Sequence, residues 1–247
     1  FTLDRQAIGG DLNTWTTDWE PWSPSGDRFL IYTTNGLVKI FDGSTGETLQ
    51  TLSGHDPYEI NQVAWSPGGD LVAVTSRWKD TTIVYQADTG QILHKIPGGF
   101  ETDLVFGRWS PDGDRFVTRG VGGAKIYQAA TGRQLFDLEV PPLNGWRALW
   151  SPDGSSILTL HGHEFVIIWD AETGQEIHRI EDLPWLTTVD WSPSGELFLV
   201  SAGSFVYLFD PLTGLMVDKL SGTFSWSFTI VFSQDGEHIA AVGQDNT

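Results

Sequence analysis

A five-residue turn motif that returns six times constrains this 247-residue chain more than any other feature. Its copies begin 41 to 44 residues apart, and each starts with an aromatic residue, at Trp22, Trp65, Trp109, Trp150, Trp191 and Phe232. Five copies continue with Ser-Pro, one variable residue and glycine, and the sixth reads Phe-Ser-Gln-Asp-Gly. Proline presets φ for a turn and glycine supplies a positive φ, so each copy is predicted to be a tight turn. Self-similarity at this period indicates a chain built from stacked repeats.

A second motif recurs at a nearly constant distance from the first. A Thr-Gly pair places glycine 23 to 25 residues after the aromatic residue, at Gly46, Gly90, Gly132, Gly174 and Gly214. The segments between the turns, such as 71–75 and 165–169, are rich in β-branched and aromatic residues and nearly continuously apolar, which favours strands covered on both faces. Four strands in each repeat of this length, here called a to d, are typical of propeller blades. The predicted fold is all-β, a β-propeller of four-stranded antiparallel blades.

The fourth repeat carries a family resemblance. Trp150-Ser-Pro-Asp-Gly, a strand, and then Ile168-Trp169-Asp170 before Thr173-Gly174 resemble the WD-repeat family, and the pattern covers essentially the whole chain. The resemblance implies a non-catalytic platform that binds other macromolecules. The family's Gly-His pair survives only at Gly54-His55 and its Trp-Asp pair only at Trp169-Asp170. We therefore expect its His-Ser-Asp-Trp hydrogen-bond network to be absent from most blades, with His55 making the one structural hydrogen bond that survives.

The repeats predict one propeller domain over residues 1–247. It would have five full blades and part of a sixth, at about 15–54, 55–99, 100–142, 143–183, 184–222 and 223–247. Residues 1–10 are expected to form strand d of a preceding or closing blade. Strands c and d of the sixth repeat would be missing, and Phe1 is not an initiator methionine. We therefore expect a segment of a larger protein whose ring has six or seven blades, without a choice between them.

Composition excludes several classes of function. Lys and Arg number 14 against 32 Asp and Glu, and the formal net charge of −18 repels a phosphate backbone, so no nucleic-acid partner is expected. The absence of cysteine removes disulfides, thiolate nucleophiles and cysteine-ligated metals. No apolar run is long enough to cross a bilayer and no signal segment is visible, so direct membrane insertion is not expected. The compartment stays open, with the cytoplasm slightly favoured.

No motif in the chain predicts a reaction or a cofactor. Nucleophile elbow, phosphate loop, dinucleotide fingerprint and zinc-protease patterns are all missing, so we expect no enzyme activity. Asp112 and Asp114 lie in a motif turn, where carboxylates are expected as turn formers rather than as a general acid and base. His161-Gly-His163 is the only histidine pair with spacing suited to a metal, but two ligands do not make a site. We expect two exposed loop histidines and no metal.

Six of the twelve tryptophans lie outside the repeated positions, and most of these gather at one end of the blades. In an up-and-down sheet the bc turns and da connections share one end, here called the top face. The top-face tryptophans are predicted to be Trp15, Trp78, Trp146, Trp185 and Trp226. Exposed tryptophan is enriched at binding hot spots, so the chain is predicted to be a scaffold or sensor module that docks protein partners, or other domains of its own chain, on this face. The alternatives are rings packed between blades and a pocket for a glycan or modified peptide.

Overall fold

The computed structural model describes residues 21–32, 36–55, 60–76, 81–97, 107–221 and 227–243. Nineteen strands and no helix occur within these residues. Accordingly, no helix that could cross a membrane is found in the described ranges. The chain forms two compact units, one of residues 1–121 and 125–135 and the other of residues 122–124 and 136–247.

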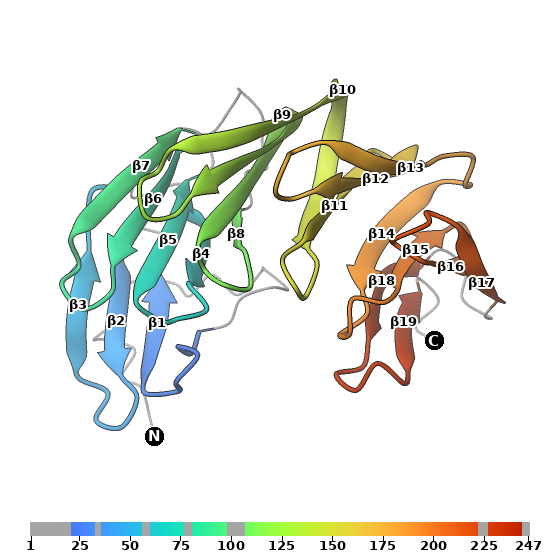
Figure 1. The fold of residues 1–247 in the computed structure, drawn as a ribbon. Helices are drawn as coiled ribbons and strands as arrows, with labels where there is room; N and C mark the ends of the chain where they lie inside the picture. The colour runs from blue at the N-terminus through green and yellow to red at the C-terminus, as the bar shows by residue number, and fades with distance from the viewer. Residues whose placement is uncertain are drawn as a thin grey trace. The chain divides into compact units, whose positions relative to one another are not determined.

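The first unit consists of antiparallel sheets. Trp22 pairs with Phe29 as an isolated bridge, at the place predicted for strand a of the first repeat. The sheet that follows it contains β1 (Arg28–Tyr32), β2 (Val38–Asp42) and β3 (Thr48–Leu52). The next sheet has four strands, β4 (Ile60–Trp65), β5 (Leu71–Ser76), β6 (Thr81–Gln86) and β7 (Ile92–Pro97) (Figure 1). After it, β8 (Gly107–Trp109) pairs with the first residues of β9 (Arg115–Gln128).

The second unit repeats the same arrangement. Its first four strands are β10 (Gln134–Trp150), β11 (Ser156–His161), β12 (Phe165–Asp170) and β13 (Glu176–Ile180). They are followed by β14 (Leu186–Trp191), β15 (Phe198–Ala202), β16 (Phe205–Phe209) and β17 (Met216–Ser221), and then by the pair β18 (Ser227–Phe232) and β19 (Ile239–Gly243) (Figure 1). The predicted all-β class with four-stranded antiparallel blades is confirmed. The strands β9 and β10, with 14 and 17 residues, are longer than predicted, and each carries the chain from one unit into the other.

The serine of the motif explains why the turn recurs. Its hydroxyl accepts the backbone N–H of the residue five positions later, as Ser192 does from Leu197 at 3.0 Å. Its carbonyl oxygen accepts the N–H of the motif glycine, which has a positive φ in every copy. The serine hydroxyl makes the same bond in the other five copies, at Ser23, Ser66, Ser110, Ser151 and Ser233. The hairpin between strands a and b is therefore closed by one side chain and one glycine in every repeat.

The motif tryptophan joins neighbouring sheets. The indole N–H of Trp191 donates to the carbonyl oxygen of Leu149 at 3.4 Å, and that of Trp65 donates to Pro21 at 3.1 Å. Trp109 donates in the same way to Ala64. In each case the acceptor directly precedes the motif aromatic residue of the previous repeat. Because the motif recurs every 41 to 44 residues, each of these indole donors meets the backbone acceptor that precedes the same motif in the previous sheet.

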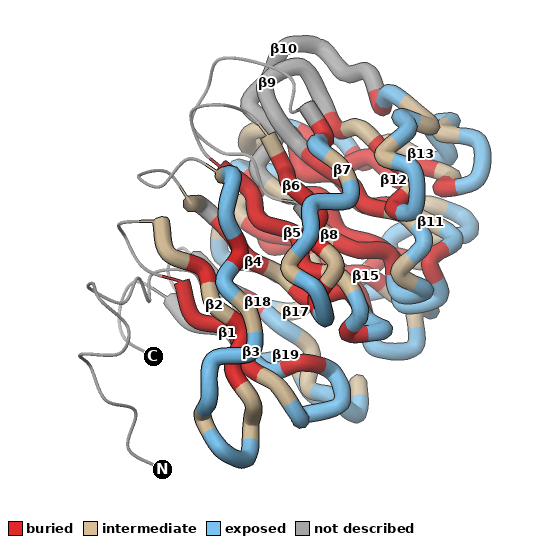
Figure 2. The backbone as a smooth tube through the Cα atoms, turned by 90° about the vertical axis from the view of Figure 1, so that its left-hand side faces the viewer, coloured by how far each residue is buried: buried red, intermediate tan, exposed pale blue. Residues whose placement is uncertain are grey.

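Apolar side chains fill the space between successive sheets. One core cluster joins β1 and β2 to β4, β5 and β6, and another joins β11 and β12 to β14, β15 and β16. Buried residues lie along the inner strands, whereas exposed residues lie at the turns and on the outer strands β3, β13 and β17 (Figure 2). The nearly continuous apolar segments of the sequence are buried as predicted, since all of β15 and all but the last residue of β12 are buried.

Candidate functional site

Trp185 is the one predicted top-face tryptophan whose side chain lies among the described residues. Its side chain is 52% exposed, although tryptophan is usually buried. Trp15, Trp78 and Trp226, together with the side chain of Trp146, lie outside the described residues. The site is therefore built from Trp185 and its neighbours in the second unit.

Trp185 stacks on His163. The ring centroids are 3.9 Å apart and the rings are inclined by 17°. His163 lies in the turn between β11 and β12, whereas Trp185 directly precedes β14. Two hydrogen bonds hold these segments together, because the N–H of Leu186 donates to the carbonyl oxygen of His163 at 3.1 Å and Nδ1 of His163 donates to the carbonyl oxygen of Leu186. The indole is thus supported by a ring that is itself held by the backbone beside it.

The backbone before β14 is strained. Asp182 and Trp185 have φ values of 62° and 30°, in the left-handed region that side chains other than glycine rarely adopt. Such residues cost about 1 to 3 kcal/mol each and persist when their surroundings fix them. Here Gly203, in the turn between β15 and β16, donates its N–H to the carbonyl oxygen of Trp185 at 3.2 Å. The exposed indole is therefore held in one position by two neighbouring top-face turns.

His161 is buried, and the prediction of an exposed loop histidine is wrong at this position. The residue ends β11 and is 2% exposed. Its Nε2 lies 2.7 Å from the hydroxyl of Thr159, which also accepts the indole N–H of Trp169 at 2.7 Å. Its ring stacks on Phe165, with centroids 5.0 Å apart. The turn signal at Gly162 placed both histidines in a loop, but alternation along β11 directs His161 into the core beside Thr159.

The two histidines face different partners, so they do not form a common ligand site. His163 contacts Trp185 and Leu186, whereas His161 contacts Thr159 and Phe165. Among the described residues there is no group of three or more His, Cys, Asp or Glu side chains that could hold a metal ion. Burial is the main reason why the pKa of His161 falls to about 4, with the nearby Arg179 guanidinium lowering it further and Glu176 acting in the opposite direction. His161 is therefore a neutral core residue at pH 7.

His55 makes the structural hydrogen bonds predicted for it. Its Nδ1 lies 2.9 Å from the hydroxyl of Tyr85, and its Nε2 donates to the carbonyl oxygen of Gly36 at 2.7 Å. Burial raises the pKa of Tyr85, so this hydroxyl stays neutral. The expectation that this is the one surviving polar connection is wrong, because Trp169, Thr159 and His161 form a second network in the fourth repeat. Sequence reasoning missed this network because its histidine, His161, is the last residue of strand b, whereas the histidine of the family's Gly-His pair precedes strand a.

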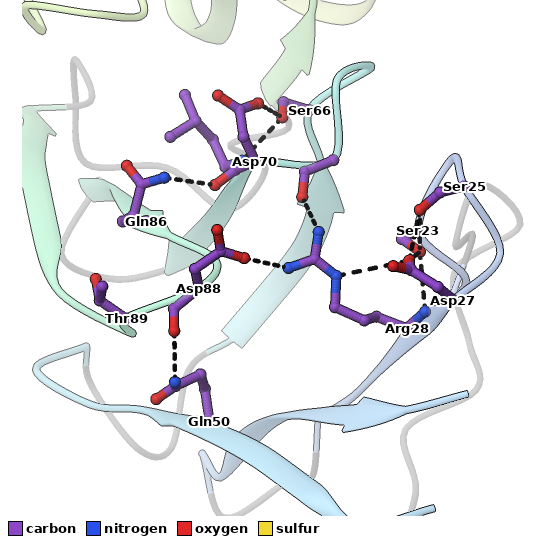
Figure 3. Close-up of polar contacts among 12 residues, drawn as sticks. Ser23, Ser25, Asp27, Arg28, Gln50, Ser66, Asp70, Gln86, Asp88 and Thr89 are labelled. Carbon is purple, nitrogen blue, oxygen red and sulfur yellow. Dashed lines mark hydrogen bonds and ion pairs between the residues drawn. The ribbon is translucent and has the colours of Figure 1, made fainter. Parts of the chain in front are cut away.

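Charged side chains at the opposite end of the sheets serve packing. Arg28 donates to the carboxylate of Asp88 at 2.7 Å and to the carbonyl oxygen of Gly69 at 2.8 Å (Figure 3). Its guanidinium also lies 5.2 Å from the Trp65 ring centroid. Asp27 accepts hydrogen bonds from Ser25 and Ser23, which lower the pKa of its carboxyl group. These contacts bridge β1 to the turns of the next sheet. The lowered pKa keeps the Asp27 carboxylate ionised within its turn.

The predicted role of the motif carboxylates is also seen at Asp112. Its Oδ1 accepts the hydroxyl of Ser110 at 2.5 Å and the backbone N–H of Asp114 at 3.0 Å. Both bonds lie within one turn, so the Asp112 carboxylate acts as the turn former that the sequence predicts, and Asp114 contributes its backbone N–H.

Comparison with known proteins points to one kind of repeat. Residues 46–85 match the family model described as WD domain, G-beta repeat. The chain is 22% identical over 188 residues to the WD repeat-containing protein slp1 of Schizosaccharomyces pombe, an alignment that covers 74% of this chain and 37% of that protein. It is 21% identical over 214 residues to WD repeat-containing protein 11 of Mus musculus, covering 85% of this chain and 15% of that protein.

A third relative is a bromodomain and WD repeat-containing protein of Dictyostelium discoideum. It is 25% identical over 122 residues, which are 48% of this chain and 6% of that protein. The chain thus spans 6 to 37% of the length of these three relatives.

Proposed function

We propose, from a resemblance to the WD-repeat family that the sequence matches confirm, that this chain is a non-catalytic protein-interaction module. In this proposal it docks a protein partner, or another domain of its own chain, on the top face. The observation that supports it best is the half-exposed indole of Trp185, stacked on His163 and fixed by strained backbone. Neither a nucleic acid nor a membrane is proposed as the partner.

A fixed tryptophan suits this role for a physical reason. Binding hot spots are enriched in tryptophan because the ring removes a large area from water while immobilising few rotatable bonds. A side chain already held in its bound position loses still less entropy when a partner arrives. The ring stack and the backbone hydrogen bonds of Leu186 and Gly203 supply this preorganisation. The other four top-face tryptophans stay predictions.

A small-ligand pocket remains the second prediction. Such a pocket would need several aromatic rings around one sugar face or one cation. At the described part of the top face, the stacked rings of Trp185 and His163 offer an exposed aromatic surface, which suits contact with a protein partner. A change in tryptophan fluorescence on titration with glycans or modified peptides would support the pocket instead.

The test is capture of partners from cell extract with Trp185→Ala as the bait. Truncating a hot-spot tryptophan costs about 2 kcal/mol or more, so partner affinity is expected to fall by roughly 30-fold. Trp22→Ala is the matched control because Trp22 is 50% exposed and belongs to a motif turn at the other end of its sheet. Partners retained by Trp22→Ala and lost by Trp185→Ala support the proposal, and hydrogen exchange should then show protection of residues 181–186. Equal capture by both variants contradicts it.

A further inference from the structure

We propose that the outer edge of the fifth repeat is a second docking surface, which takes an apolar segment flanked by basic residues. Four exposed side chains form this outer apolar patch. They lie in the turn before β17 and at its start, and their exposed fractions are 86% for Leu212, 66% for Leu215, 54% for Met216 and 59% for Val217. Met216 and Val217 are successive strand residues and point to opposite faces, so the exposed side chains lie on both faces of this edge. Large apolar side chains exposed to this extent mark an interaction site.

The other repeats show that the patch is specific to the fifth. Its residues lie two positions before and one, two and three positions after the Thr-Gly glycine. At the same four places, no other repeat has more than two apolar residues. The first reads Ser44, Glu47, Thr48 and Leu49, and the fourth reads Glu172, Gln175, Glu176 and Ile177. A requirement shared by all repeats explains Val217, because this position is apolar in every repeat, but it does not explain Leu212, Leu215 and Met216.

The positions equivalent to residues 215–217 stay exposed in repeats that are followed by another sheet. In earlier repeats the residue four places after the glycine contacts the next sheet, since Gln50 donates to the carbonyl oxygen of Asp88 at 2.6 Å and His94 donates to that of Ala130 at 2.6 Å. His178 donates to Leu212 in the same way at 2.8 Å. The three residues before each of these contacts nevertheless remain exposed. The exposure of residues 215–217 therefore does not depend on a sheet packed after β17.

The partner is expected to meet side chains rather than to add a strand. The backbone N–H of Lys219 donates to the carboxylate of Asp218 at 2.7 Å, so it is not available to a further strand. The Lys219 ammonium group lies 3.8 Å from the ring centroid of Phe205 and 5.2 Å from that of Tyr207. Charged side chains at an edge are a common defence against strand addition. Met216, with its flexible thioether, can adapt to an apolar side chain of the partner.

Charge selects the flanks of the partner. Asp218 is an exposed residue directly after Val217, whereas Glu176 on β13 is paired with Arg179 and adds no unpaired charge. The cations nearby are already engaged, because Arg179 pairs with Glu176 at 2.6 Å and Lys219 lies over aromatic rings. With a net charge of −18, the chain attracts a basic segment and repels an acidic one. The same charge opposes pairing with a second copy.

The test uses two fluorescein-labelled peptides with one apolar core of leucine and phenylalanine, flanked in one peptide by lysines and in the other by glutamates. Fluorescence anisotropy with the 247-residue chain is expected to show binding of the lysine peptide only. The variant L212S/L215Q/M216T carries side chains that other repeats have at these places, and its affinity is expected to be lower by roughly tenfold or more. The control I92T/L93T changes the equivalent strand positions of the second repeat and should bind like the unmodified chain.

Three outcomes overturn the proposal. They are equal binding of both peptides, equal binding by both variants, and a dimer in sedimentation experiments that the triple variant dissociates, which would make a second copy the occupant. Near-UV circular dichroism establishes that the variants are folded. Trp185→Ala should leave the affinity for the lysine peptide unchanged, so the proposals for the top face and for the outer apolar patch can be contradicted independently.

Discussion

Gly214 lies directly against His178. A Cβ atom on this glycine would be 2.8 Å from Cγ of the imidazole, closer than real Cβ contacts. The turn of one sheet thus rests on the outer strand of the sheet before it, and the imidazole also donates to the carbonyl oxygen of Leu212 in that turn. The glycine serves two purposes here, since its φ of +69° is also in the left-handed region.

Gly214→Ala is therefore expected to destabilise the chain more than an ordinary turn glycine substitution. The left-handed φ costs about 1 kcal/mol for alanine, and the clash with His178 adds a similar amount. Gly26→Ala is the matched control because Gly26 has a φ of +73° and a Cβ added to it would meet no atom within 4 Å. Urea unfolding of both variants separates strain from packing, and equal losses would contradict the close contact.

Because His161 is buried in its neutral form, the free energy of unfolding is expected to fall as the pH drops from about 6.5 to about 4. Its folded pKa of about 4 lies below the ordinary value of 6.5, so the unfolded chain binds the proton first. The stability that neutral His161 provides is complete above pH 6.5 and is lost as the pH falls to about 4, by about 3 kcal/mol in all. Its Nδ1 atom is buried without a hydrogen-bond partner, so protonation would create a charged N–H group with no acceptor for its hydrogen bond.

His161→Phe keeps a ring against Phe165 and removes the titrating group. Because carboxylates also titrate below pH 5, the quantity to measure is the difference between the unfolding curves of the variant and the unmodified chain across this pH range. The free energy of unfolding of the unmodified chain minus that of the variant should become smaller as the pH falls. A difference that stays constant would show that His161 is not buried in its neutral form.

Ser192→Ala tests the serine of the turn motif. Ser192 is 5% exposed, and its hydroxyl accepts the backbone N–H of Leu197, so removing it leaves a donor without an acceptor at a cost of about 1 to 3 kcal/mol. Ser194→Ala changes an exposed serine of the same turn and should cost less than about 0.5 kcal/mol. Thermal unfolding followed by circular dichroism measures both losses. Similar values would mean that glycine and proline define the turn without the hydroxyl.

The sequence predicts local features of this fold better than long-range ones. The turns could be read because serine, proline and glycine act within five residues, and the buried strands could be read because β12 and β15 are continuously apolar. Burial of His161 could not be read, since it depends on Thr159 and on Trp169 in the next strand. The partner of Trp185 depends on a contact across 22 residues of sequence, for which its own segment carries no signal. The outer apolar patch can be detected in the sequence by comparing the same four positions across the five repeats.

The indole bond between Trp191 and Leu149 also bears on how such a chain can grow. Each of the first five repeats carries an indole donor and, directly before it, a backbone acceptor, so a copied segment of 41 to 44 residues brings both halves of the connection with it. A duplicated repeat can bond to the repeats before and after it without any change in them. Gene duplication could therefore lengthen the array one unit at a time.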